Sequence, residues 1–298
     1  MKISSQGRLS LPNETRIEDT VSKHYPELSQ TLRVAADFVV ANQMDVATRS
    51  LRSVSGSSGV SPAAFSRLAR ALGFETYENL RETCRNGLWD RGASFAERAE
   101  RLRNCADETD AILHRHTTAC LNNISEMTDA IATARLRAAV DALQAANSVL
   151  LFGAFSSFGI IEYMGYLAQF FASNWSIGGR MGTSLGSSLA DLGSTDVVLI
   201  VTKTPYARRA VAVAERAKTT GAQVIVVTDS HICPAIKFAN FPFIVPSDSP
   251  QFFSSYAATI ALLETIIAMV VAQTGDKATN RIAEIEGHNN RLGEFWTE

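Results

Sequence analysis

Four short apolar runs, rich in β-branched residues, alternate with long helical patterns in the second half of this 298-residue chain, and this alternation limits the folds it can adopt. The predicted strands cover residues 149–153, 196–202, 223–228 and 241–245. Residues 175–192 are Gly/Ser-rich and ambiguous, with 175–177 as a candidate for a further short strand. Helical patterns cover residues 158–173, 207–220 and 254–274. Apolar strands that alternate with helices are typical of a parallel sheet covered on both faces. The sequence therefore predicts a parallel α/β sandwich after residue 148.

Composition fits a soluble globular protein, because 46% of the residues are hydrophobic and 19% are charged. The net charge of −2 gives no global basic field, so any nucleic-acid surface has to be local. The first eleven residues lack the apolar core of a signal peptide. The most apolar stretch, residues 256–272, is interrupted by Glu264 and is expected to be too short and too polar to span a bilayer. We expect a cytoplasmic protein with no membrane partner.

A helix-turn-helix pattern lies in the first half of the chain. Gly59 suits the positive φ of a tight turn between two helices, and Val60 is expected to fill their junction. Ser61 is a good N-cap and Pro62 fits the first position of the second helix, which ends at Gly73. Its predicted buried residues are Phe65, Leu68, Ala69 and Leu72, and its outward residues are Ala63, Ala64, Ser66, Arg67 and Arg70.

Residues 46–74 contain four arginines and no acidic residue, which makes a local basic patch of the kind that phosphate binding needs. Small and polar residues at the start of the second helix would let it enter a major groove. A helical dimerisation scaffold with solvated arginines is the alternative. The candidate contacts to double-stranded DNA are Arg49, Arg52, Ser61, Ala63, Ser66, Arg67 and Arg70.

The run SGVSPAAFSRLARALGFETYENLRETC resembles the N-terminal domain of the RpiR/MurR family of bacterial transcription regulators. The matching residues are Gly59, Val60, Ser61, Arg67, Leu72, Gly73, Phe74, Tyr77 and Leu80. The departure lies in residues 51–55, which are serine-rich where the family usually has Leu-Ala. The resemblance implies a DNA-binding regulator with a sugar-isomerase-type (SIS) domain after the helix-turn-helix.

Polar residues follow the predicted strands, where ligands of parallel sheets usually bind. Residues 153–159 after the first strand and 202–208 after the next long strand each open a helix, and helix N-termini favour anions. Simple helix capping is the alternative role for these hydroxyls. The candidate effector contacts are Ser156, Ser157, Thr202, Thr204, Tyr206 and Arg208.

The same layout resembles a SIS domain, whose junctions usually have Gly-x-Gly-x-Ser and Ser-x-Ser-Gly-x-Thr. Here Phe155 replaces the second glycine of the first motif, while Pro205 and Ala207 replace the glycine and closing threonine of the second. Thr202 and Thr204 stand for the two serines. The resemblance implies a sugar phosphate as the effector. The replaced motif residues leave open a different, less charged metabolite or no ligand at all.

An isomerase of this fold would need an acid and a base, for which Glu162, His231 and Glu264 are the candidates. None has a recognisable catalytic loop, so we predict no enzyme activity, with a phosphosugar isomerase-like enzyme as the alternative. His114, His116 and Cys120 lack a fourth metal ligand, and we expect neither a metal nor a cofactor. The remaining cysteines, Cys84, Cys105 and Cys233, are scattered and expected to be reduced.

The predicted fold class is α plus α/β, with an all-α helix-turn-helix domain before the SIS-type sandwich. The predicted segments are a flexible arm over 1–25, the DNA-binding domain over 26–92, a helical linker or dimerisation segment over 93–133, the SIS domain over 134–275 and a helical tail over 276–298. Paired DNA half-sites imply a homodimer or homotetramer. The predicted pairing surfaces are residues 256–272 and an apolar stripe over 102–131.

Overall fold

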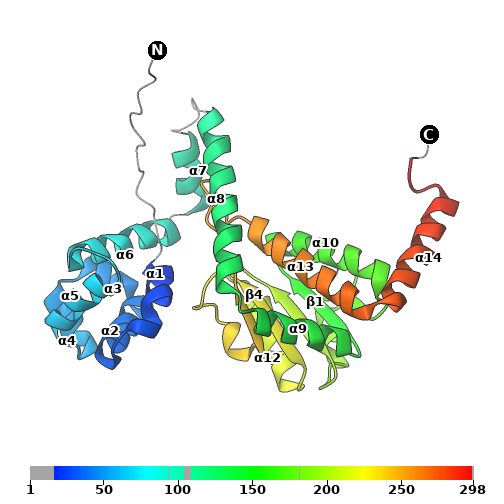
Figure 1. Ribbon diagram of the computed structural model, residues 1–298, viewed down its shortest axis with the longest axis horizontal. Helices are drawn as coiled ribbons and strands as arrows, with labels where there is room; N and C mark the ends of the chain where they lie inside the picture. The colour runs from blue at the N-terminus through cyan, green and yellow to red at the C-terminus, as the bar shows by residue number, and fades with distance from the viewer. Residues whose placement is uncertain (1–16, 93, 104–108, 181, 297–298) are drawn as a thin grey trace, which may run out of the picture. The chain divides into compact units, whose positions relative to one another are not determined.

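A computed structural model describes residues 17–92, 94–103, 109–180 and 182–296, and the chain divides into two compact units. Unit 1 is Met1–Arg98 and unit 2 is Ala99–Glu298 (Figure 1). Each unit has its own hydrophobic core, because the buried clusters of the first lie between Ile17 and Cys84 and those of the second between Met127 and Ala278.

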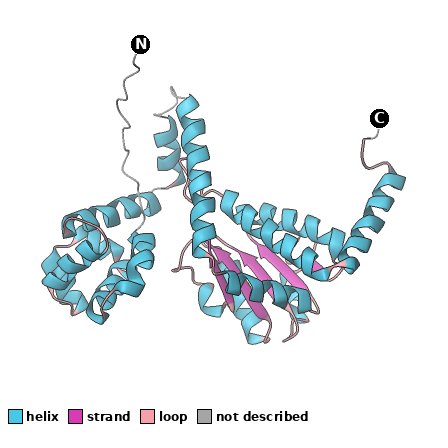
Figure 2. Ribbon diagram, in the orientation of Figure 1, coloured by secondary structure: helices cyan, strands magenta, loops and turns pink. Residues whose placement is uncertain are grey.

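The secondary-structure elements of unit 1 are all helices among its described residues (Figure 2). Its helices are α1 (Ile17–His24), the 3-10 turn η1 (Tyr25–Glu27), α2 (Gln30–Ala41), α3 (Gln43–Thr48), α4 (Leu51–Ser58), α5 (Pro62–Ala71), α6 (Tyr77–Gly92) and the start of α7 (Phe95–Arg103). Phe65 lies at the centre of the core, edge-on to Phe38 at 6.3 Å and to Tyr77 at 6.0 Å between ring centroids. The flexible arm predicted over residues 1–25 is wrong for its C-terminal part. The chain is helical from Ile17, and Ile17 and Val21 are buried in this core. Residues 1–16 lie outside the described residues.

Unit 2 contains a five-stranded parallel sheet with the strand order β2-β1-β3-β4-β5. The strands are β1 (Val149–Gly153), β2 (Trp175–Ile177), β3 (Val197–Val201), β4 (Gln223–Thr228) and β5 (Phe241–Ile244). All five residues of β1 and of β3 are buried, as both faces of a parallel sheet require. The predicted strands and the parallel α/β sandwich are confirmed, including the short strand at 175–177.

Helices cover both faces of this sheet. On one face lie α9 (Thr133–Ala145), α10 (Ser156–Phe171) and α13 (Ala257–Thr274), and on the other lie α11 (Leu185–Ala190), α12 (Arg208–Thr219) and the 3-10 turn η2 (Ile236–Phe238). The strands alternate between the two cores: Leu151 and Leu199 face the first, whereas Leu150 and Val198 face the second. The last helix, α14 (Asp276–Leu292), packs on α10 and α13.

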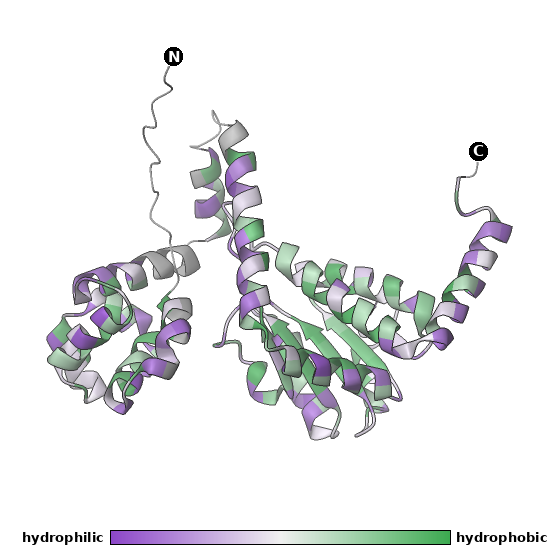
Figure 3. Cartoon of the chain, viewed as in Figure 1, coloured by the Kyte–Doolittle hydropathy of each residue, from purple (hydrophilic) through white to green (hydrophobic). Residues whose placement is uncertain are grey.

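α13, with 18 residues, is shorter than the helical pattern predicted over 254–274, but the expectation that this stretch is too short and too polar to span a bilayer is not met. It has a mean hydropathy of 1.7 over 18 residues and meets the length and composition of a membrane-spanning helix, as the one such helix among the described residues. The same test is passed by core helices of soluble proteins. Here one face, including Leu262, Leu263 and Ile266, is buried in the core of unit 2, and Figure 3 shows its hydrophobic character beside the sheet.

α8 (Thr109–Ala130) is tied to unit 2 by a buried amide. Asn123, which is 2% exposed, donates from Nδ2 to the carbonyl of Asp248 at 2.8 Å and accepts from the amide of the same residue at 3.1 Å. The predicted apolar stripe divides over two faces, because Met127 is buried in the core whereas Leu113 and Leu121 are exposed. α8 therefore packs as part of unit 2 along one face and keeps an apolar face open.

Candidate functional site

The turn between α4 and α5 has the geometry expected of a helix-turn-helix. Gly59 ends α4 in the left-handed conformation, with φ of 69°, and Val60 is buried behind it. The Ser61 hydroxyl then accepts from the Ala64 amide at 3.3 Å and caps α5, with Pro62 at the first helical turn. Gly59, Ser61 and Pro62 therefore have the turn, N-cap and first-turn roles that were predicted from their residue types.

α5 buries one face and exposes the other. Phe65, Leu68 and Ala69 point into the core, and so does Ala64, which contradicts its predicted outward position. Ala64 lies in the first turn on the same side as Leu68, four residues later, so the two share a face. Exposed on α5 and its cap are Ser61, Ala63, Arg67 and Arg70.

Some of the seven candidate DNA contacts already have hydrogen-bond or ion-pair partners within the protein, and others do not. Arg67 and Arg70 have no acidic side chain within ion-pair distance among the described residues, and Arg52 is exposed in the same way. Arg49 instead pairs with Asp45 at 3.2 Å. Ser66 is half-buried and its hydroxyl donates to the Pro62 carbonyl at 3.2 Å. The geometry leaves three unpaired guanidinium groups on or beside α5.

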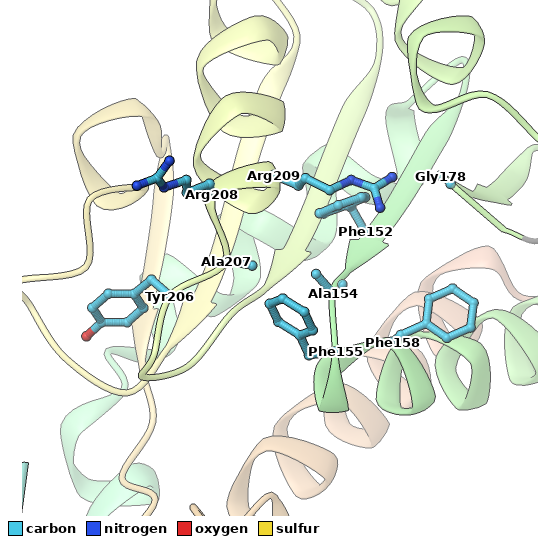
Figure 4. Close-up of a pocket in the computed structure, with 11 residues that line it drawn as sticks. Phe152, Ala154, Phe155, Phe158, Gly178, Tyr206, Ala207, Arg208 and Arg209 are labelled. Atoms are coloured by element: carbon cyan, nitrogen blue, oxygen red, sulfur yellow. The ribbon is translucent and has the colours of Figure 1, made fainter. Parts of the chain in front are cut away.

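In unit 2, a pocket of about 690 Å³ opens at the carboxyl ends of β1 and β3. This position is the topological switch point, because the chain runs from β1 outward to β2 and then returns to place β3 on the other side of β1. Figure 4 shows the residues that line it at the starts of α10 and α12. They are Phe152, Gly153, Ala154, Phe155, Phe158, Gly178, Gly179, Tyr206, Ala207, Arg208 and Arg209.

Phe155 is the least expected residue of this pocket. It has φ of 54° and is the one non-glycine residue with a positive φ among the described residues. Its side chain is also 81% exposed. The backbone thus keeps a conformation that suits the glycine of the family motif, although the side chain is aromatic. Strained backbones of this kind concentrate at ligand-binding positions.

Gly153, by contrast, is required by packing. A Cβ atom placed there would lie 2.5 Å from the Ser157 carbonyl oxygen and 2.9 Å from the Ile161 side chain. The end of β1 therefore touches the first turn of α10 directly, and only glycine permits that approach.

The candidate serines of the first junction bind Tyr256 and do not line the pocket. The Tyr256 hydroxyl lies 2.9 Å from the Ser156 hydroxyl and 2.8 Å from that of Ser157. The amides of Ser157 and Phe158 donate to the carbonyls of Ala154 and Phe155. Both the hydroxyls and part of the first-turn amides of α10 are thereby occupied.

The second junction is closed in a similar way. Thr202 is buried, and Thr204 donates from its amide and its hydroxyl to the carboxylate of Asp229 at 3.1 and 3.4 Å. Lys203 is also buried, with Nζ 3.4 Å from the Val245 carbonyl and 5.4 Å from the centre of the Tyr256 ring. Lys203 and Thr204 of this junction therefore have partners elsewhere in unit 2, in the Val245 carbonyl and the Asp229 carboxylate.

Two of the six candidate effector residues, Tyr206 and Arg208, line the pocket. Burial raises the pKa of the Tyr206 hydroxyl to about 12, and the charge of Asp229 acts in the same direction. Sequence reasoning missed Arg209, Phe155 and Phe158 as pocket residues, although the paired arginines at a helix start after a strand were a visible indication of the first.

The three acid–base candidates lie outside this pocket's lining. Glu162 forms an ion pair with Arg180 at 3.1 Å, and Glu264 accepts from the Tyr163 hydroxyl at 2.6 Å, which raises the pKa of that tyrosine. His231 lies in an exposed turn after β4. Among the described residues, no three His, Cys, Asp or Glu side chains are grouped as a metal site would require.

Comparison with known protein families gives a match within the second unit. Residues 142–269 match the family model of the SIS domain. A comparison with curated protein sequences gives no match.

Two solved structures share the fold. The sugar isomerase domain of an RpiR transcription factor from Sphaerobacter thermophilus has a TM-score of 0.56 at 20% identity and covers 59% of this chain and 98% of its own. The NanR protein of Vibrio vulnificus, solved in complex with ManNAc-6P, has a TM-score of 0.56 at 16% identity and covers 93% of this chain and 98% of its own. The resemblance to RpiR-type regulators is confirmed at the level of the fold.

Proposed function

We propose that this protein is a cytoplasmic transcription regulator that binds double-stranded DNA through α5 and senses a small-molecule effector, such as a sugar phosphate or a related metabolite, through its SIS domain. The proposal rests on Arg67 and Arg70, which are exposed on the helix that follows the Gly59–Ser61 turn and have no acidic partner among the described residues. Guanidinium groups in that position suit phosphate oxygens and base edges.

The SIS fold also occurs in sugar isomerases, so the regulator has to be distinguished from an enzyme. The acidic candidates Glu162 and Glu264 are engaged with Arg180 and Tyr163, and neither lines the pocket. An isomerase function would also leave the basic face of α5 without a role. We therefore propose an effector-binding domain without isomerase activity.

DNA recognition by paired helices requires at least two copies of the chain, as a homodimer or a homotetramer. The face of α13 that points away from the sheet and the exposed face of α8 with Leu113 and Leu121 are the proposed pairing surfaces. Effector binding would favour one arrangement of the copies and so change the spacing of the α5 helices.

Gel retention on the DNA upstream of the protein's own gene tests the proposal. We expect salt-dependent binding, and we expect Arg67→Ala and Arg70→Ala each to weaken it by about 1–3 kcal/mol if the side chain contacts a base, or to lower the salt slope by about one if it contacts a phosphate. Arg137→Ala, which removes an exposed arginine from α9, is the matched control and should leave binding unchanged. Equal retention of all four proteins, or retention of none, would contradict the proposal.

A further inference from the structure

We propose that the pocket between β1 and β3 accepts an anion with a flat apolar body, such as an aromatic carboxylate, in preference to a sugar phosphate. The inference deepens the proposed function and rests on it in one respect, namely that this pocket is where the effector binds. Three features of the pocket carry it: the chemistry of the walls, the arginines at the mouth and the conformation of Phe155.

The walls offer apolar surface and almost no hydrogen-bonding side chains. Of the lining residues other than the two arginines, only Tyr206 carries a polar side-chain atom, and its hydroxyl oxygen is buried. Figure 4 shows that hydroxyl directed away from Phe155. A sugar would have to bury several hydroxyl groups against phenyl rings, which is costly, whereas a flat apolar body would stack on them.

Two guanidinium groups supply charge at the edge of these walls. Arg208 and Arg209 are exposed, and no acidic side chain lies within ion-pair distance of either among the described residues. Gly179 makes room for Arg209, because a Cβ atom at that position would lie 3.2 Å from its Nη2 atom. In Figure 4, Arg209 extends above Phe152 toward Gly178, while Arg208 points to the opposite side. Arg209 is therefore the residue placed to bind a carboxylate in bidentate fashion.

The groups that would bind a phosphosugar are already occupied. Ser156 and Ser157 hold the Tyr256 hydroxyl, and Thr204 holds Asp229. Opening these contacts for a phosphate would take the buried Ser157 hydroxyl and Asp229 carboxylate away from these partners. An arginine-bound carboxylate needs none of them.

Phe155 completes the argument, since a strained and exposed phenyl ring at a pocket mouth has no packing role in the free protein. A flat ligand body laid against Phe155 and Phe158 would cover it. The side chain that breaks the glycine pattern of the first junction thus becomes the contact that selects an aromatic ligand.

Isothermal titration of the full-length protein tests the inference. The probes are indole-3-acetate and 3-phenylpropionate, against glucose 6-phosphate and N-acetylmannosamine 6-phosphate. We expect at least one aromatic carboxylate to bind about tenfold or more tightly than either sugar phosphate, which corresponds to the loss of one charge-assisted contact or stacking partner. Tighter or equal binding of a sugar phosphate, or no binding of either carboxylate at about 5 mM, a concentration that still detects millimolar affinity, overturns it.

Variants locate the binding. Arg209→Ala should weaken carboxylate binding by about tenfold or more, and Phe155→Gly should weaken it several-fold without lowering the melting temperature. Arg216→Ala removes an exposed arginine from the last turn of the same helix and should have no effect. Unchanged binding in Arg209→Ala places the ligand elsewhere and rejects the inference.

Gel retention without ligand separates this inference from the proposed function. Retention of upstream DNA together with a failure of both carboxylates would reject the ligand class alone. Carboxylate binding that depends on Arg209, in a protein that does not retain DNA, would reject the regulator and leave the pocket assignment intact.

Discussion

At the residue scale, the positive φ of Phe155 lowers the stability of the free protein, and no packing of its side chain offsets the loss. A non-glycine residue held at positive φ costs of order 1–3 kcal/mol, and an exposed phenyl ring adds no packing. Phe155→Gly releases that strain, while the greater freedom of glycine in the unfolded chain costs about 0.5–1 kcal/mol.

We therefore expect Phe155→Gly to raise the free energy of unfolding of ligand-free protein by about 1 kcal/mol in urea titrations. Phe158→Gly, a change inside α10 where the backbone is helical, is the control and should lower it. A fall in both variants would mean that Phe155 packs in the free state.

Tyr77 is a second residue of interest, because its polar hydroxyl lies in an apolar core. Its ring packs on Phe65, but its hydroxyl is buried and has no hydrogen-bond partner among the described residues. Burial raises the pKa of Tyr77 from 10.0 to about 12. In the unfolded chain the hydroxyl ionises near pH 10, so ionisation favours unfolding between pH 10 and pH 12, and the stability present below pH 10 is lost across that window.

We expect Tyr77→Phe to be neutral or stabilising by up to about 1 kcal/mol at neutral pH, because the buried hydroxyl makes no hydrogen bond. The difference between variant and parent should grow from pH 10 to pH 12, measured as the unfolding of unit 1 followed by circular dichroism. A difference that is independent of pH would show that Tyr77 ionises alike in the folded and unfolded states.

At the element scale, Asn123 adds two hydrogen bonds to the packing that holds α8 against the rest of unit 2. Asn123→Ala removes both hydrogen bonds to Asp248 and leaves its backbone groups without the amide that now satisfies them. We expect a loss of about 1–3 kcal/mol in the stability of unit 2, measured by thermal unfolding. Asn122→Ala, at the exposed neighbouring position on α8, should change stability by less than about 0.5 kcal/mol.

The strands β1, β3 and β4 were predictable because each is a run of mostly buried apolar residues whose length and β-branching leave little choice. The turn at Gly59–Pro62 was predictable because its chemistry is local. The pocket residues were not, because the partner of Ser156 and Ser157 is Tyr256, about a hundred positions away. Which hydroxyl remains free for a ligand is decided by tertiary contacts, and no local pattern contains that information.

At the scale of the whole molecule, the separate cores predict separate unfolding. Leu68 is fully buried in unit 1, and Leu68→Ala should cost about 2–5 kcal/mol. Calorimetry of the full chain should then show one transition shifted to lower temperature and the other unchanged. Leu199→Ala, at a buried position of β3, should shift the other transition alone. A single transition that moves as one in both variants would show that the two cores unfold together.

Tyr256 joins the start of α10 at the pocket to the start of α13, two regions that the proposed regulator would have to connect. Its hydroxyl holds Ser156 and Ser157 directly behind Phe155, and its backbone forms the N-cap of α13. A ligand that displaced Phe155 would therefore act, through Ser156 and Ser157, on Tyr256, the residue at which the proposed subunit contact of α13 begins. In this scheme a single side chain links effector binding to the assembly of the copies. We expect Tyr256→Phe, which removes the hydroxyl oxygen, to abolish the effect of the ligand on assembly while ligand binding and the subunit contact are both retained.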